Sequence, residues 1–220
     1  MTQHTTIKAW SFDEGMAIAR WLLREQVRMN ATIVGGLRRQ EKMITRIELL
    51  TPHTDAYDRL QKFVMLHVPD DVLIKPPQHG RFLRATRGYA PFFKEAHFEL
   101  ARFDATPLGC PGTSPDLIPL RIFRYDHGPE GNEGWATLIR TGPNDYGRAC
   151  LWHWARVSRG GRSEGGYPMT ADNRRLPCPS EAEAYRLLDL PFTDPKDRHP
   201  SQIPGWTEMT TKMTATPETA

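Results

Sequence analysis

The sequence predicts an α+β protein in which a mixed sheet with helices on one side is followed by a small α+β unit. Three observations support this class. Apolar residues recur at helical spacing over residues 12–29, "TIVGG" and "MITRIELL" have the composition of short strands, and two more strand-like segments, "HFELARFD" and "IPLRIFRY", follow. Helices and strands therefore alternate along the first part of the chain, which favours a mixed sheet.

Length, charge and cysteine content limit the classes of protein to consider. The chain has 220 residues, of which 39% are hydrophobic, enough for one ordinary domain or two small ones. The formal net charge is only +3, so any preference for polyanions must come from local clusters of charge. Cys110, Cys150 and Cys178 are odd in number and form no Cys-x-x-Cys pair, which argues against a disulfide framework and a zinc module. With no secretory leader and no apolar run of about 18 residues, we expect an intracellular, reducing location, cytoplasmic or nucleoid-associated, and no membrane partner.

The first unit is expected to begin with a helix. Ser11 and Glu14 have the spacing of a capping box, which predicts a helix from Phe12 to about Met29. "TIVGG" then predicts a strand that ends in a Gly-Gly turn, and "MITRIELL" predicts its neighbour. Arg46 and Glu48 are two residues apart in that second strand, so their side chains should share one face of the sheet.

The middle of the chain continues the same pattern. Residues 55–67 are expected to form a helix and "VLIKPP" a short strand that its prolines end. Strands at "HFELARFD" and "IPLRIFRY" are separated by "TPLGCPGTSPDLIP", whose four prolines predict a loop.

A second unit is expected to start near Trp135. Helical periodicity within residues 144–161 ends at a Gly-Gly pair, and Ser180 with Glu183 marks the start of another helix that ends before Pro191. After Arg198 the chain is rich in Pro, Thr and Met without periodicity, which predicts disorder. The expected organisation is an amino-terminal tail at 1–11, a first unit at 12–134, a second unit at 135–198 and a disordered tail at 199–220.

Three segments resemble a known family. "VGGLRRQEKM" resembles the helix entry of family X DNA polymerases, the polymerase-beta-like nucleotidyltransferases, and especially their minimal viral members. "RTGPNDY" at 140–146 is similar to a motif beside the incoming nucleotide, and "PSEAEAYRLLDLPFTDPKDR" at 179–198 is similar to the family's closing segment. The motifs occur in the family's order over residues 12–198. The resemblance implies a nucleotidyltransferase-type palm at 12–134 and a thumb-like subdomain at 135–198.

The resemblance also implies where catalytic carboxylates should lie. Family members hold two divalent ions with three carboxylates during nucleotidyl transfer to a 3′-hydroxyl. The corresponding positions here are Arg46, Glu48 and Arg121, so the formal charge of the site changes from −3 to +1 and Glu48 is the only retained carboxylate. Guanidinium groups have no lone pairs for Mg²⁺. We therefore expect an inactive site with no cofactor, and Mg²⁺ only if Asp116 or Asp126 restores a remodelled one.

Binding can persist where catalysis is lost. The residues expected to contact a nucleotide or its phosphates are Gly35, Gly36, Arg38, Arg39, Thr141 and Gly142. The expected DNA contacts are Arg140, Arg148, Arg156, Arg159 and Arg162, of which Arg148, Arg156 and Arg159 fall near one another on a helical wheel. Trp152 is a candidate for stacking on an unpaired base, whereas Trp154 is expected in the core and His153 is expected to be an ordinary helix residue. The Gly142–Pro143 bond is a candidate for the cis form.

Three functions stay open from the sequence. The first is a DNA-binding pseudo-polymerase that takes gapped or primer-template DNA without sequence preference. The second is an active gap-filling polymerase with a remodelled metal site. The third is a protein-interaction module of viral or mobile-element origin. In "SEGGY", Ser163 and Gly165 replace family residues that face the minor groove and the nucleotide, which puts nucleotide selection in doubt.

Overall fold

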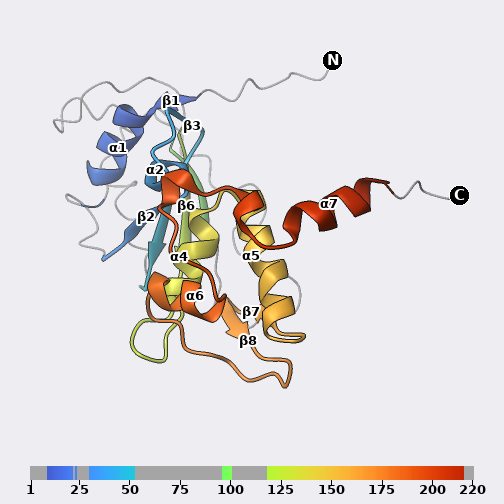
Figure 1. The fold of residues 1–220 in the computed structure, drawn as a ribbon. Helices are drawn as coiled ribbons and strands as arrows, with labels where there is room; N and C mark the ends of the chain where they lie inside the picture. Colours follow the sequence, from blue (N-terminus) through green and yellow to red (C-terminus); the bar gives the residue numbers. More distant parts are fainter. Residues whose placement is uncertain (1–8, 22, 24–29, 53–95, 101–117, 216–220) are drawn as a thin grey trace, which may run out of the picture. The chain divides into compact units, whose positions relative to one another are not determined.

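The structure is a computed structural model that describes residues 9–21, 23, 30–52, 96–100 and 118–215. The chain divides into two compact units, Met1–Tyr125 and Asp126–Ala220, and both contain helices and strands (Figure 1). The predicted α+β class is therefore confirmed. The division falls nine residues before the predicted boundary because Asn132 and Gly131 are hydrogen-bonded within the second unit, to Gly166 and Cys178.

The first unit contains a four-stranded mixed sheet among its described residues. Its elements are β1 (Trp10–Ser11), α1 (Phe12–Trp21), β2 (Thr32–Val34), α2 (Gly35–Arg38), β3 (Met43–Ile44), β4 (Ile47–Thr51), β5 (Ala96–Leu100) and β6 (Ile118–Arg124). The strand order is β2-β4-β6-β5, with β4 and β6 parallel and the other two pairs antiparallel. β1 and β3 form a separate antiparallel pair. The sheet thus joins strands that are far apart in the sequence.

α1 begins as the capping box predicts. The backbone N–H and hydroxyl of Ser11 both donate to Glu14 Oε2, at 2.9 and 2.8 Å, and the Glu14 N–H donates back to the Ser11 hydroxyl at 3.3 Å. Close packing follows: a Cβ on Gly15 would lie 2.0 Å from Ile44 Cδ1. The predicted continuation to Met29 falls mostly outside the described residues.

The predicted single strand "MITRIELL" is wrong in one respect. Its pairing with the "TIVGG" strand is confirmed, since β4 pairs with β2, but the segment forms two strands, β3 and β4. The break at residues 45–46 arises because β3 pairs with β1 whereas β4 enters the main sheet. The predicted helix at 55–67, the strand "VLIKPP" and most of the proline-rich loop lie outside the described residues, and "HFELARFD" is described only to Leu100.

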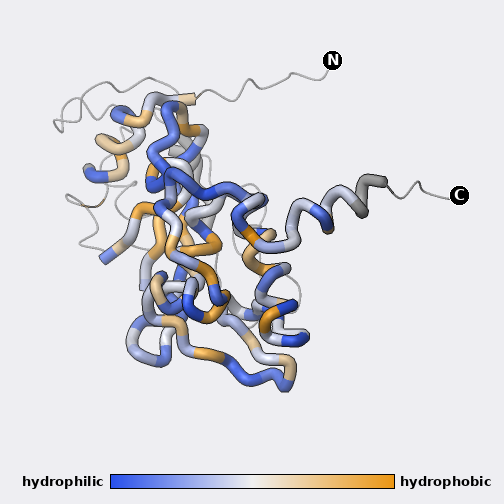
Figure 2. Tube along the Cα trace, in the orientation of Figure 1, coloured by the Kyte–Doolittle hydropathy of each residue, from blue (hydrophilic) through white to orange (hydrophobic). Residues whose placement is uncertain are grey.

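The second unit is mainly helical. Its elements are α4 (Glu133–Thr141), α5 (Asn144–Val157), β7 (Arg162–Glu164), β8 (Tyr167–Met169), α6 (Glu181–Leu187), the short 3-10 helices at Pro195–Asp197 and Pro200–Gln202, and α7 (Trp206–Ala215). The predicted cap of α6 is confirmed, because the Glu183 N–H donates to the Ser180 hydroxyl at 3.2 Å. α4 was not expected from the sequence, and the tube of α5 alternates between hydrophobic and hydrophilic segments (Figure 2).

The chain after Arg198 differs from the predicted disordered tail. It forms a 3-10 helix at Pro200–Gln202 and then α7, while residues 216–220 lie outside the described ranges. Ile203 is buried in the core of the second unit and Trp206 packs against it. Local composition gives no sign of this, because the order comes from packing onto the earlier helices. No helix in the described ranges has the length and apolar character needed to cross a membrane.

Candidate functional site

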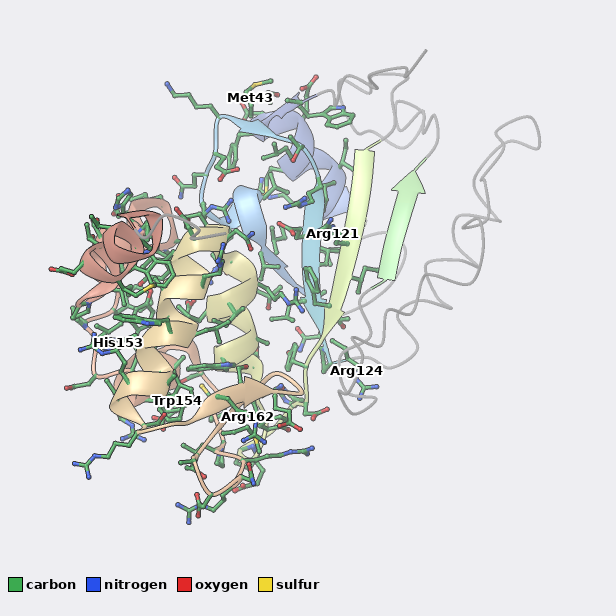
Figure 3. The ribbon with its side chains drawn as sticks, turned by 90° about the vertical axis from the view of Figure 1, so that its right-hand side faces the viewer. Met43, Arg121, Arg124, His153, Trp154 and Arg162 are labelled. Carbon is green, nitrogen blue, oxygen red and sulfur yellow. The ribbon has the colours of Figure 1, made fainter. Side chains whose placement is uncertain are left out.

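The three positions of the expected metal site meet on the sheet of the first unit. β4 runs between β2 and β6, and its Glu48 is directly opposite Val34 on one side and Arg121 on the other. Directly opposite residues of neighbouring strands project from the same face. Figure 3 shows Arg121 on the strand beside β4. The fold therefore places Glu48 and Arg121 next to each other, although 73 positions separate them in the sequence.

Arg46 completes this group as an ion-pair partner of Glu48. It lies just before β4, and its Nε donates to Glu48 Oε1 at 3.2 Å. The side chain of Arg46 is 42% exposed, whereas that of Glu48 is 12% exposed. Glu48 is thus already engaged by Arg46, one of the two arginines at the expected ligand positions.

The second oxygen of Glu48 lies against the Gly-Gly turn. A Cβ on Gly35 would lie 1.9 Å from Glu48 Oε2, and one on Gly36 would lie 2.5 Å from Glu41 Oε2. Gly35 also has φ +66°, a left-handed conformation that favours glycine. The Glu48 and Glu41 carboxylates thus pack onto this turn, where the sequence predicts phosphate contact.

The arginines that follow the turn are partly engaged as well. Arg38 is the last residue of α2 and is half-buried. Arg39 donates through Nε to Glu41 Oε1 at 3.0 Å and pairs with the same carboxylate through Nη2. The Glu41 carboxylate therefore offsets part of the positive charge at the end of α2.

Of the two alternative carboxylates, the structure describes only Asp126. Its Oδ2 accepts a hydrogen bond from the Tyr167 hydroxyl at 2.8 Å, and both residues belong to the second unit. Burial, the hydrogen bond and the Asp126 charge raise the pKa of Tyr167 to about 12. Asp116 lies outside the described residues. Within the described ranges, no group of three or more His, Cys, Asp or Glu side chains is arranged to hold a metal ion.

The arginines expected to contact DNA are spread over four segments of the second unit. Arg140 is on α4, Arg148 and Arg156 are on α5, Arg159 is in the following turn and Arg162 is on β7. Arg148, Arg156, Arg159 and Arg162 are exposed, and Arg140 is half-buried. The helical-wheel grouping does not include Arg159, because α5 ends at Val157 and Arg159 adopts φ +54°.

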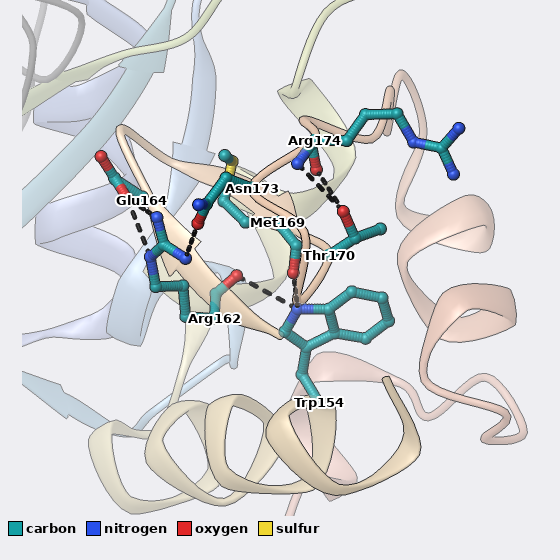
Figure 4. Close-up of polar contacts among 7 residues, drawn as sticks. All are labelled: Trp154, Arg162, Glu164, Met169, Thr170, Asn173 and Arg174. Carbon is teal, nitrogen blue, oxygen red and sulfur yellow. Dashed lines mark hydrogen bonds and ion pairs between the residues drawn. The ribbon is translucent and has the colours of Figure 1, made fainter. Parts of the chain in front are cut away.

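Arg162 belongs to a polar network on the β7–β8 hairpin. It pairs with Glu164 and also donates to the Asn173 side-chain oxygen (Figure 4). Trp154 holds this hairpin against α5, since its indole N–H donates to the carbonyls of Arg162 and Met169, each at 3.1 Å. Trp154 is buried, which confirms its predicted core position.

Trp152 is half-buried, and two side chains pack on its ring. The Arg156 guanidinium lies 4.7 Å from its ring centroid, and Trp206 packs edge-on at 5.7 Å. Arg156 Nη1 also donates to the Pro204 carbonyl at 3.0 Å. Edge-on aromatic pairs add about 0.5–1.5 kcal/mol and exposed cation–π contacts about 0.5–1 kcal/mol, so this assembly is of modest strength.

His153 is a buried helix residue (Figure 3). Its Nε2 is 3.1 Å from the Leu188 carbonyl, which requires a proton on Nε2 for a hydrogen bond. Burial lowers the pKa of His153, and the nearby Arg156 acts in the same direction. The predicted reading of an ordinary helix histidine fits this packing.

Sequence reasoning missed Arg198 as an organising residue of the second unit. Its side chain is fully buried, and Nη2 pairs with Glu181 Oε1 at 2.6 Å while Nε donates to the Thr193 carbonyl at 3.3 Å. The guanidinium also lies 5.7 Å from the ring centroids of both Tyr146 and Tyr185. A lone arginine in a polar segment carries no sequence signal for such burial.

The "TGP" segment is a buried bend between α4 and α5. Thr141 and Gly142 are buried, and the Gly142–Pro143 bond is cis, as anticipated.

Cys150 and Cys178 are buried free thiols, and burial raises the pKa of each to about 12. Cys110 lies outside the described residues. Cys150 and Cys178 are therefore packing residues in the second unit.

Comparison with known proteins adds no family assignment. No model of a known protein family matches the chain, and a search of curated proteins finds no significant match. The geometry defines an α+β protein in which two arginines, Arg46 and Arg121, adjoin Glu48 on the sheet of the first unit.

Proposed function

We propose that this chain is a DNA-binding homologue of family X DNA polymerases whose two-metal site does not catalyse nucleotidyl transfer. In this proposal the first unit corresponds to a palm and the second to a thumb. One observation carries it: Arg46 and Arg121 adjoin Glu48 where three carboxylates would be needed, with Arg46 Nε 3.2 Å from Glu48 Oε1. Motif positions far apart in the sequence thus fall together on adjacent strands, which supports the resemblance.

The chemistry of the three side chains supports the loss of catalysis. Mg²⁺ requires several oxygen ligands in near-octahedral geometry. Glu48 offers two oxygens, of which Oε1 is engaged by Arg46 and Oε2 lies at Gly35. A divalent ion would have to displace one guanidinium and tolerate the other. The positive charge of the two guanidinium groups repels a divalent cation, whereas carboxylates would attract it.

DNA binding is assigned to the exposed arginines of the second unit. Arg148 and Arg156 are two turns apart on α5, and both are exposed. Guanidinium contacts with phosphates release counterions, so binding should weaken with salt and depend little on base sequence. Gapped or primer-template DNA is the proposed partner, because family X chemistry acts on such ends.

The first test combines incorporation with binding on one single-nucleotide-gapped duplex. With Mg²⁺ or Mn²⁺ we expect no nucleotide addition, while fluorescence anisotropy should report salt-sensitive binding of the same DNA. Addition that Glu48→Ala abolishes would overturn the loss of catalysis and indicate a remodelled active site. Absence of binding at low salt would favour the protein-interaction alternative.

A paired-charge variant tests the DNA surface. Arg148→Glu with Arg156→Glu should weaken binding by about tenfold or more, because both phosphate contacts become repulsive. Arg186→Glu with Lys196→Glu is the matched control, since these exposed residues give the same change in net charge. Equal losses in the two double variants would contradict a specific contact on α5.

Restoring the carboxylates tests the assignment of the metal positions. Asp at positions 46, 48 and 121 together should give Mg²⁺ binding that calorimetry detects, whereas Ala at the same positions should not. Both variants remove Arg46 and Arg121, so they differ only in the carboxylate groups that the Asp variant adds. No heat of binding from the triple Asp variant would mean that these positions do not form a metal site.

A further inference from the structure

Two residues singled out for nucleic-acid contact, the half-buried Trp152 and the exposed Arg156, are contacted by the chain's own carboxyl-terminal segment. Arg156 lies over the Trp152 ring at 4.7 Å, and Trp206 meets the same ring edge-on at 5.7 Å. The Pro204 carbonyl accepts from Arg156 Nη1 at 3.0 Å. The ring and the guanidinium are thus both in use within the molecule. We call residues 204–215 the C-terminal segment.

The fit of this segment depends on Gly205. Its φ is +79°, and a Cβ there would lie 2.5 Å from Arg156 Nη1 and 3.2 Å from Trp152 Cη2. The backbone at Gly205 therefore lies directly against the stacked pair, and a ligand of these two groups would compete with it. A larger residue at position 205 would be strained by the left-handed backbone and would crowd Trp152.

Several residues of the C-terminal segment beyond Trp206 face solvent. Thr207, Glu208 and Thr211 are exposed on α7, and the Thr210 and Thr211 hydroxyls donate to carbonyls of the same helix. Figure 1 shows α7 extending away from α5 beyond the contact at its start. The helix therefore satisfies much of its polar surface internally, and its first residue makes the aromatic contact with α5.

We propose that the C-terminal segment occupies in cis a binding site for an unpaired nucleotide, and that single-stranded DNA displaces it. The base stacks on Trp152, and Arg156 exchanges the Pro204 carbonyl for a phosphate oxygen. This inference rests on the proposed DNA-binding function and adds a single-strand contact together with its internal competitor.

The chemistry of the pair selects this ligand. A planar ring beside a guanidinium matches a base and its phosphate, and such stacking accepts any base. A duplex keeps its bases stacked on one another, so an unpaired nucleotide, as in a gap, presents the free face. Exchange of a neutral carbonyl for a charged phosphate oxygen strengthens the hydrogen bond to Arg156.

The test measures the affinity of the full chain for a labelled oligothymidylate and for the gapped duplex. Trp206→Ala and Gly205→Ala should each tighten oligothymidylate binding by about three- to tenfold, because each weakens the competitor. Thr207→Ala is the matched control on the exposed side of α7 and should leave affinity unchanged. Trp152→Ala should weaken binding. In hydrogen exchange, oligothymidylate should increase amide exchange within residues 204–215.

The outcomes separate the two proposals. If gapped duplex binds but Trp206→Ala and Gly205→Ala leave the oligothymidylate affinity unchanged, with exchange at 204–215 unaltered, the competition is overturned and the proposed function stands. If the oligothymidylate and the gapped duplex both fail to bind, with the parent chain and with the Trp206→Ala variant alike, the proposed function itself fails. Tighter binding by both variants together with faster exchange supports the competition.

Discussion

Each unit contains an arginine–glutamate ion pair, and the two pairs differ in how exposed the arginine is. In the first unit Arg46 Nε is 3.2 Å from Glu48 Oε1, and in the second Arg198 Nη2 is 2.6 Å from Glu181 Oε1. The Arg46 side chain is 42% exposed, whereas that of Arg198 is 0% exposed. Exposure therefore distinguishes a pair that a ligand can reach from one that holds the core.

The difference indicates how each unit uses its arginines. Water screens the Arg46 pair, so the pair is weak and its members can be exchanged for another partner. Removal of one member of the Arg198 pair would leave a charge in a buried place, which is costly. The first arrangement suits a pair whose members can take another partner, and the second suits a structural cation in the core of the second unit.

The largest effect is expected from Arg198→Met. The change leaves Glu181 with 11% exposure and without this guanidinium, and it removes the cation beside Tyr146 and Tyr185. We expect the free energy of unfolding to fall by about 3–5 kcal/mol. Urea denaturation followed by circular dichroism measures it. Arg186→Met, which breaks the exposed pair with Glu183, should cost much less. Similar costs for the two would remove the distinction by exposure.

A smaller loss is expected from Gly35→Ala in the first unit. The new Cβ would meet Glu48 Oε2, and the backbone φ of +66° would disfavour any side chain. The expected cost is about 1–2 kcal/mol from the backbone alone, with more from the contact. A double-mutant cycle with Glu48→Ala should recover the contact part but not the backbone part. Full recovery would mean that backbone strain is absent.

A pH titration should act on the second unit through His153. Its folded pKa lies below the ordinary value of about 6.5, mainly because of burial, so the unfolded state binds more protons between the two values. Stability is then complete above the ordinary value and decreases as the pH falls toward the folded pKa. Urea midpoints from pH 7.5 down to 5 should show a loss that His153→Gln reduces.

The smallest effect is expected from Arg46→Gln. Because the Arg46 side chain is 42% exposed, water can solvate Glu48 in its place, so its loss should change the free energy of unfolding by less than the loss of Arg198 does, by about 1 kcal/mol. The same denaturation experiment measures it beside Arg198→Met. A cost of several kcal/mol would show that Arg46 is a structural cation like Arg198, and would weaken the view that its partner can be exchanged.

Local signals account for the parts of the fold that the sequence predicts. The Ser11–Glu14 box and the Ser180 cap mark the starts of α1 and α6, because these bonds join residues three positions apart. α4 was missed because it has a glycine in its first turn and no side-chain cap. Gly134 is there because a Cβ would lie 1.8 Å from the Ser180 carbonyl, a contact between distant segments.

The candidate site divides in the same way. Sequence reasoning identified Arg46, Glu48 and Arg121 as a set from motif positions, and the register of β4 with β6 places the last two side by side. It could not find the contact of Glu48 with Gly35 or the cover on Trp152, because both depend on how separate elements pack.

The sequence by itself determined the α+β class, the capped starts of two helices and the charge of the expected metal site. These follow from residue type and from spacings of a few residues, which act before any long-range contact forms. Only the tertiary structure decided that "MITRIELL" divides between two sheets, that Arg198 is buried and that Trp206 meets Trp152. Each of these depends on which distant segments pack together, because burial in the packed structure sets how strongly an ion pair or a ring contact stabilises the protein.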